Sequence, residues 1–289
     1  MRFSTIACAI TAVAAVVTAA PTPMPPKATS ILNYALTLEH LESEFYKEGL
    51  AKFGHRAFID AGFSAEVRDR IVHIGEHENV HVSTLTSVIT SLKGTPVPAC
   101  TYNFPLDNVN QFLAVAQALE NTGVSAYLGA AAGLSGDLLT AAGTIVTVEA
   151  RHVSYLSEIW GESGLPYSFD TPLSPQQVVT MATTLITECP YDLGVTPFNH
   201  LTATLPQAGS KMVGTTFTGK GSGDFDNTYC QFLYGNMNSI SVRKDCTLPE
   251  DAVGYVYVLV TDSMTPVTLT SQSNILAGPT LLFNGDHTH

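Results

Sequence analysis

The stretch IGEHENVHVSTL, residues 74–85, fits two patterns that share residues but predict different chemistry. His77-Glu78-x-x-His81 is the pattern of a zinc metalloprotease helix, in which both histidines bind the metal and the glutamate is the general base. Glu78-x-x-His81 alone is half of a carboxylate-bridged site for two metal ions. The choice between the two depends on what the rest of the chain offers.

A second copy of this stretch occurs later in the chain. The pattern Ile-x-x-x-Glu-x-x-His-Val-Ser-x-Leu is repeated at residues 145–156, where Glu149 and His152 supply the second Glu-x-x-His pair. Val148 stands at the position that His77 has in the first copy. The feature that recurs is therefore Glu-x-x-His, which favours the two-metal interpretation over the protease.

Two further helical stretches, one ahead of each Glu-x-x-His pair, also repeat. Both read Ala-x-x-Leu-Glu-x6-Tyr. Because residues seven apart lie on one side of a helix, Glu39 shares a face with Tyr46, and Glu120 shares a face with Tyr127. Glu42, one turn after the first of these acids, is an alternative to it, but the second copy has glycine at that position.

The order along the chain is thus Glu, Glu-x-x-His, Glu, Glu-x-x-His on four successive helices. Four carboxylates and two imidazoles that meet in a bundle core repel one another and are costly to desolvate unless cations balance them. Two divalent ions bridged by carboxylates satisfy this requirement, with iron as the first choice and manganese as the second. The predicted ligands are Glu39, Glu78, His81, Glu120, Glu149 and His152.

In the predicted arrangement each ion takes one imidazole and one terminal carboxylate. The pairs are Glu39 with His81 and Glu120 with His152, and Glu78 and Glu149 bridge the ions. Such ligand sets leave positions open for dioxygen or peroxide. Tyr46 and Tyr127 are candidates to supply an electron or to hold a bridging ligand, whereas His73 and His77 are expected to be packed or solvated.

Three segments carry a resemblance to a known family: LNYALTLEHLESEFYKEGL, ALENTGVSAYLGAA and TVEARHVSYL. They resemble secreted proteins of the ferritin-like superfamily, of the desiccation-related and fungal stress-response type. The resemblance covers about residues 30–189, and the C-terminal part resembles the tails of fungal members. It implies a four-helix bundle with a long crossover between the second and third helices, and the Pro-rich residues 93–106 supply a connection there.

The predicted fold class is α+β, with two domains. Residues 30–189 form the helical bundle, whose first helix has Ser30 as its N-cap and whose fifth helix begins at Ser174-Pro175 and ends at Cys189. Residues 190–289 form a small β-sandwich, because Gly, Pro, Asn and Thr become frequent and short β-branched runs appear. The strand candidates are GYVYVLVTD, CQFLYG, SISV and ILAGPTLLF.

The N-terminus and the composition bear on location. Residues 1–19 read as a secretory signal peptide, followed by a Pro-rich linker at residues 20–29. We therefore expect a protein of the extracellular space or cell wall, with no membrane association once the signal is removed. With a net charge of −12 and no basic run, nucleic acid is not an expected partner.

Four cysteines remain after signal removal, which suggests two disulfides in a secreted chain. Cys230 and Cys246 lie in the β-rich region and are expected to pair. Cys100, in the crossover, and Cys189, at the expected end of the fifth helix, form the other predicted pair.

Two classes of function fit these features. One is a di-iron or di-manganese oxidase or peroxidase in stress response. The other is a non-catalytic protein that binds metal, or a cell-wall or surface interaction protein that uses the bundle as a scaffold. The zinc protease is a minor third alternative, and a monomer or small oligomer is expected in each case.

Overall fold

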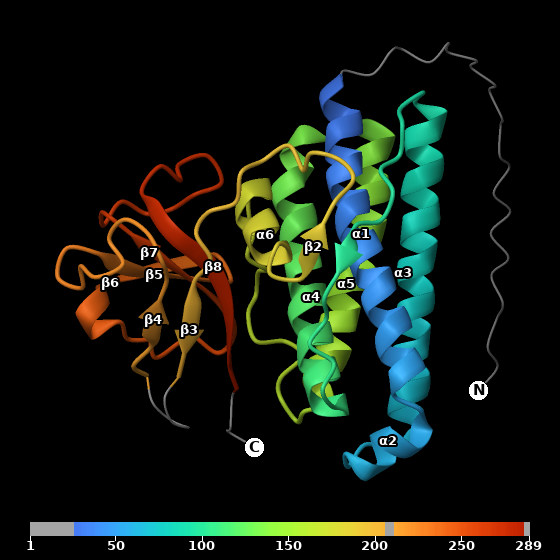
Figure 1. Ribbon diagram of the computed structural model, residues 1–289, viewed down its shortest axis with the longest axis horizontal. Helices are drawn as coiled ribbons and strands as arrows, with labels where there is room; N and C mark the ends of the chain where they lie inside the picture. Colours follow the sequence, from blue (N-terminus) through green and yellow to red (C-terminus); the bar gives the residue numbers. More distant parts are fainter. Residues whose placement is uncertain (1–25, 206–210, 286–289) are drawn as a thin grey trace, which may run out of the picture.

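Four long helices form a bundle in the computed structural model, which describes residues 26–205 and 211–285. They are α1 (Pro26–Lys52), α3 (Ala65–Ser91), α4 (Val109–Ala130) and α5 (Gly136–Glu158), with the short α2 (His55–Asp60) between α1 and α3. α1 packs on α3, α4 packs on α5, and α1 also contacts α4. The connection from α3 to α4 runs the length of the bundle, so these two helices point the same way (Figure 1). The expected bundle with a long crossover is therefore observed.

The apolar core of the bundle is divided into two clusters along the helix axes. The first contains Phe45 and Phe112, and the second contains Leu36 and Ile89. Each cluster arises from apolar residues at three- and four-residue spacing, which places them on one helix face. The polar residues of the Glu-x-x-His repeat lie between the two clusters.

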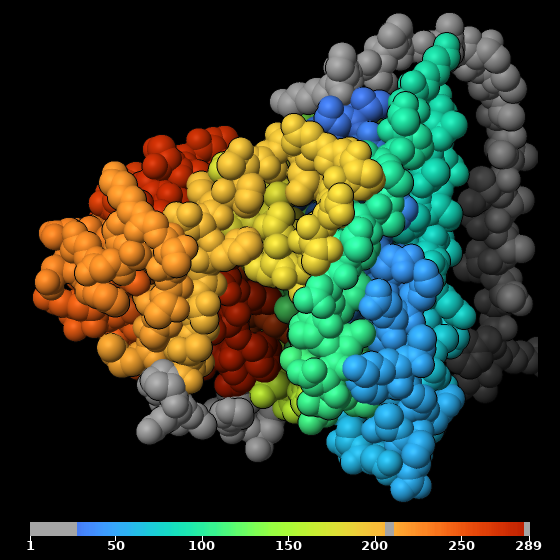
Figure 2. Space-filling model, in the orientation of Figure 1, coloured from blue at the N-terminus to red at the C-terminus, as the bar shows by residue number. Residues whose placement is uncertain are grey.

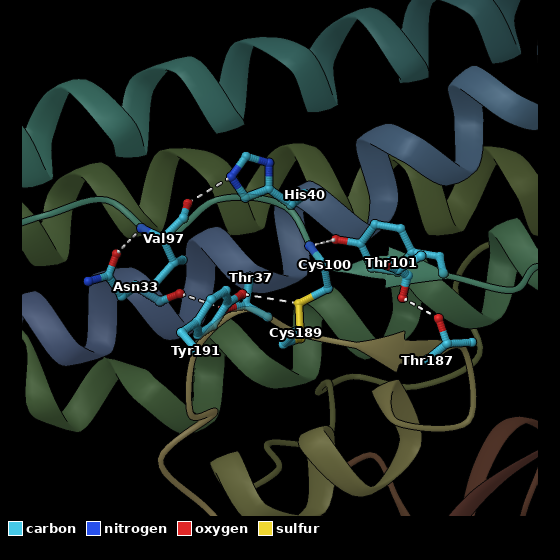
Figure 3. Close-up of a disulfide and its surroundings, with 10 residues drawn as sticks. Asn33, Thr37, His40, Val97, Cys100, Thr101, Thr187, Cys189 and Tyr191 are labelled. Carbon is cyan, nitrogen blue, oxygen red and sulfur yellow. Dashed lines mark hydrogen bonds between the residues drawn. A yellow bond between two sulfur atoms is a disulfide. The ribbon is translucent and has the colours of Figure 1, made fainter.

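A disulfide clamps the crossover to the chain that follows the bundle (Figure 3). Cys100 is bonded to Cys189, and the adjoining strands β1 (Thr101–Tyr102) and β2 (Ile186–Glu188) pair antiparallel. On the α1 side, Asn33 accepts a hydrogen bond from the backbone N–H of Val97 at 3.0 Å. The predicted pairing of Cys100 with Cys189 is confirmed, and the crossover is held on one side by this disulfide and on the other by α1.

The C-terminal part is built on an antiparallel four-stranded sheet. Its order is β6 (Met237–Val242), β5 (Tyr229–Tyr234), β7 (Gly254–Thr261) and β8 (Ile275–Asn284). A two-stranded sheet of β3 (Thr202–Thr204) and β4 (Gly214–Thr216) completes it, together with the second predicted disulfide, Cys230–Cys246. The expected sandwich therefore consists of two sheets of different size, one with four strands and one with two. All four predicted strand segments are observed, and the α+β class is confirmed.

The central strand β7 is buried on both faces, so the sheet joins two cores. Val256 and Val258 face the apolar cluster shared with β3 and β4, whereas Tyr257 and Leu259 belong to the cluster of the bundle. This alternation follows from the two-residue period of a strand. Tyr257 also accepts a hydrogen bond from Asn121 of α4 at 2.7 Å, which fixes the sheet to that helix.

Two helix boundaries differ from the sequence prediction. α1 begins at Pro26, so residues 26–29 of the expected linker are helical and Ser30 lies inside the helix. Proline is favoured at the first position of a helix, which explains the earlier start. The predicted signal peptide and the first part of the linker lie outside the described residues.

The fifth helix, α6 (Pro175–Ala182), is shorter than predicted and does not reach Cys189. Its start is correct, because Ser174 is the N-cap with a full capping box. The hydroxyl groups of Thr183 and Thr184 donate to carbonyl oxygens of the last turn, which competes with continued helix. The β-branched residues that follow pair with the crossover as β2 instead. The six-residue α2 was not foreseen.

Among the described residues, no helix combines the length and the apolar character needed to cross a membrane.

The crossover disulfide should contribute more to stability than the one in the β-rich part. Cys100 and Cys189 are 89 residues apart, whereas Cys230 and Cys246 are 16 apart. Loop-closure entropy then predicts about 4–5 kcal/mol for the first disulfide and about 3 kcal/mol for the second. Urea unfolding of the two paired Cys→Ser variants, followed by helical circular dichroism, measures both values. A smaller loss for the crossover pair would contradict the clamp.

Candidate metal centre

Six buried polar side chains from the four long helices converge between the two apolar clusters. The four carboxylates are 0–1% exposed and the two imidazoles 5–7%. They form two overlapping groups, each with its ligand atoms within 4.8 Å of one another. The first group is Glu39, Glu78, His81 and Glu149, and the second is Glu78, Glu120, Glu149 and His152. The structure thus brings together all six predicted residues, and the shared members are the two glutamates predicted to bridge.

The surroundings of the His81 ring resemble a ligand set more than a hydrogen-bond network. Its Nδ1 atom lies 3.0 Å from Glu149, 3.1 Å from Glu78 and 3.2 Å from Glu39. One N–H group cannot donate well to three carboxylates at once. Neighbouring ligand atoms around one ion with bonds of about 2.1 Å at right angles are about 3 Å apart. The observed separations match that spacing.

His152 occupies the corresponding place in the second group. Its Nδ1 atom lies 2.9 Å from Glu120 and 3.3 Å from Glu78. Glu78 is therefore near both imidazoles, as a bridging ligand has to be. In each half of the site one imidazole and one terminal carboxylate lie side by side.

Several carboxylate oxygens of the cluster accept no hydrogen bond of normal geometry within the described residues, although an imidazole Nδ1 atom lies 3.0–3.3 Å from three of them. They are Oε2 of Glu39, Oε1 of Glu78 and both oxygens of Glu149. A buried carboxylate oxygen without a partner is costly, so such atoms require an explanation. Divalent cations would satisfy them, and the carboxylate and imidazole donors suit iron or manganese. The residues present therefore fit a dinuclear metal site.

The electrostatics of the cluster favour uptake of positive charge. Burial raises the pKa of Glu78 and Glu149 well above the usual carboxyl range, and the charge of Glu120 raises both further. Burial alone would lower the pKa of His81, but its contacts with three carboxylates, that of Glu149 foremost, raise it to about 12. Protons therefore occupy the metal-free cluster, and a bound cation would displace them.

Two tyrosines support the terminal glutamates across the bundle. Tyr46 of α1 donates a hydrogen bond to Glu120 of α4 at 2.5 Å, and Tyr127 of α4 donates to Glu39 of α1. Burial, followed by the charge of the bonded glutamate, raises the pKa of both hydroxyls well above 10, so they remain donors. The sequence placed each tyrosine near the glutamate of its own helix. The structure pairs each with the glutamate of the other helix.

Glu42 is buried beside the cluster but belongs to neither ligand group. Of the two alternatives that the sequence offered, Glu39 and Glu42, it is Glu39 that lies among the converging ligands. Gly123, the counterpart of Glu42 in the repeat, leaves room for it. A Cβ atom at Gly123 would lie 3.0 Å from the Glu42 carboxyl and 3.1 Å from that of Glu149. The internal symmetry is therefore broken at one position, by an extra acid opposite a glycine.

His77 lies outside the ligand groups but contacts one of their members. Its Nδ1 atom is 3.0 Å from Nε2 of His152, and the two rings stack. Both residues line an open recess of about 470 Å³ between α3 and α5, which also contains His73. His77 is therefore exposed to solvent, but it orients a predicted ligand through that ligand's far nitrogen. The sequence did not foresee this contact, because only the folded bundle brings α3 and α5 together.

Comparison with known proteins agrees with this geometry. Residues 27–162 match the ferritin-like domain family. The helical part of the chain is thus similar to proteins of the ferritin-like superfamily, as its sequence motifs indicated. The chain is also similar to Protein rds1 of Schizosaccharomyces pombe, with 31% identity over 150 residues. That alignment covers 48% of this chain and 36% of the relative, so the chain spans only about a third of the relative's length.

The roles of the histidines can be separated by substitution. We expect His81→Ala and His152→Ala each to lose at least one equivalent of bound metal, because each removes a proposed ligand. His77→Ala should keep both equivalents and bind them about tenfold more weakly, as expected for a residue that orients a ligand. Metal analysis after equilibrium dialysis against iron(II) measures both effects. If His77→Ala releases the metal and His152→Ala retains it, the zinc-protease pattern describes the site better.

The tyrosine contacts predict a milder effect. Tyr46→Phe and Tyr127→Phe remove one hydrogen bond each from a terminal glutamate and leave every proposed ligand in place. Both variants should bind two equivalents with roughly 10- to 150-fold weaker affinity, since a hydrogen bond to a charged group contributes about 1.5–3 kcal/mol. Tyr34→Phe, at a partly buried tyrosine of α1 outside the ligand groups, is the matched control. An equal loss in that control would indicate a general packing effect.

Proposed function

We propose that the bundle binds two divalent, redox-active metal ions, iron first and manganese second, and acts as an oxidase or peroxidase on dioxygen or peroxide. The observation that carries this proposal is the pair of overlapping ligand groups that share two glutamates. Purely structural sites are usually closed by their ligands. Here each ligand group contains one imidazole and three carboxylates, and two of these carboxylates are shared between the proposed ions. Each ion would therefore keep a coordination position open for a small oxidant.

The residues of the chain have distinct roles in this proposal. Glu39 and Glu120 would each hold one ion, and the tyrosine hydroxyls donate to their other oxygens. Glu78 and Glu149, which belong to both ligand groups, would contribute to both ions. When bound, a pair of iron(II) ions would supply the two electrons that, with two protons, reduce one molecule of hydrogen peroxide to two of water.

The recess beside His77 supports access for ions and small oxidants. It lies between α3 and α5 and reaches both proposed imidazole ligands. On the opposite side the cluster is flanked by α1 and α4, which contact each other. The bundle therefore offers an entrance lined by four histidines, two arginines, Tyr155 and three aliphatic side chains, while apolar clusters close its two ends.

An extracellular location is part of the proposal. The two disulfides suit an oxidising compartment. A role in stress response rests on the family resemblance. The zinc-protease alternative has less support, because His77 is in neither ligand group while Glu78 is in both.

The experiment is anaerobic loading with iron(II), followed by addition of hydrogen peroxide or dioxygen. We expect two iron(II) per chain to bind and one peroxide to be consumed for every two irons oxidised, measured by ferric absorbance and peroxide assay. Glu78→Ala should abolish rapid oxidation, since it removes a ligand shared by both ions. Glu76→Ala, on the exposed face of the same helix, is the matched control. If wild-type protein binds iron or manganese and never reacts, the non-catalytic scaffold function stands instead.

A further inference from the structure

A second cavity lies on the opposite side of the metal cluster from the histidine-lined recess. It has a volume of about 230 Å³ and lies between α1, α4, α6 and β8. Figure 2 shows dark red β8, which lines the cavity, set back between the green helical part and the orange β-rich part. It is therefore formed by both parts of the chain.

The lining of this cavity is mainly apolar. Leucine, valine, alanine and methionine side chains come from the helices, and Pro279 and Leu281 come from β8. Its polar members are Glu42, His200 and the threonines at positions 122, 180, 184 and 280. Such a surface suits a neutral, mostly apolar molecule and disfavours ions or sugars.

The inner end of the cavity carries one acid. Glu42 is 3% exposed, lines the cavity, and has no hydrogen-bond partner among the described residues. A buried polar group of this kind normally has a partner. A carboxyl oxygen in this place can accept a hydrogen bond from a ligand hydroxyl group.

The same end of the cavity adjoins the proposed metal centre. Gly123 lines the cavity, and its missing side chain leaves the Glu42 and Glu149 carboxyls next to each other. A side chain at this position would come within 3.1 Å of Glu149, a proposed bridging ligand. A molecule bound here would thus have one end beside the metal cluster.

We propose that this cavity binds a small, mostly apolar molecule with one hydroxyl group, of the substituted-phenol class, whose hydroxyl donates to Glu42. The size agrees: an apolar cavity of about 150 Å³ holds benzene, so about 230 Å³ holds roughly nine non-hydrogen atoms. This inference names the organic substrate class of the proposed metal centre, and to that extent it rests on the proposed function. The binding itself does not require the metal.

The test uses the full chain, metal-loaded and metal-free, and the probes 4-ethylphenol and ethylbenzene in calorimetric titrations. We expect one 4-ethylphenol per chain in both forms, bound at least fivefold more tightly than ethylbenzene. Glu42→Leu should reduce this preference to less than twofold, because the acceptor is lost while apolar volume is kept. An unchanged preference would overturn the assignment of Glu42.

The second part of the test uses a variant in which a larger side chain fills the cavity. Ala118→Phe places a ring among the lining residues, and Ala114→Phe places the same ring one turn earlier on α4, at an exposed position outside the cavity. We expect at least tenfold weaker 4-ethylphenol binding in the first variant and no change in the second, with both folded by circular dichroism. Absence of saturable binding to wild-type protein overturns the inference whether or not Ala118→Phe folds. Phenol binding without metal binding would overturn the proposed function and leave the cavity assignment in place.

Discussion

The structure depends on one electrostatic constraint: four carboxylates are buried together in the middle of an otherwise apolar bundle. Taking one charged group out of water without compensation costs several kcal/mol, and like charges at close range add to that cost. Two imidazoles and two tyrosine hydroxyls compensate only part of the charge, because both oxygens of Glu149 lack a hydrogen bond of normal geometry among the described residues. The geometry around His81 and His152 is explained most simply by two cations.

The rest of the fold keeps that cluster rigid and surrounded by protein. The two apolar clusters exclude water from both ends of the site, and the disulfide-held crossover ties α3 and α4 to α1. The sheet adds a second support, because Tyr257 is hydrogen-bonded to α4 one residue after Glu120. A site of this kind gains precision from rigid elements and from residues that orient its ligands. The β-rich part thus supports α4 through Tyr257. Its strand β8 also lines the apolar cavity that we propose to bind a phenol.

Much of the site could be predicted from the sequence, because a repeat carries more information than a single motif. Two Glu-x-x-His pairs with matching flanks identified four of the six converging residues and the asymmetry between His77 and Val148, and the repeated Glu-x6-Tyr stretches identified Glu39 and Glu120. Contacts between helices could not be predicted, since they depend on how the helices face one another. The exchange of tyrosine partners between α1 and α4 and the contact of His77 with His152 are of this kind. The predicted end of the fifth helix, at Cys189, was wrong for a related reason. Pairing of β2 with the distant crossover outweighed the local helix propensity.

The most direct measurement of the central claim is anomalous diffraction from crystals of the iron-loaded protein. We predict two iron peaks inside the bundle, one between Glu39 and His81 and the other between Glu120 and His152, with Glu78 and Glu149 reaching both. A single peak bound by His77 and His81, or no peak within the cluster of carboxylates, would contradict the account.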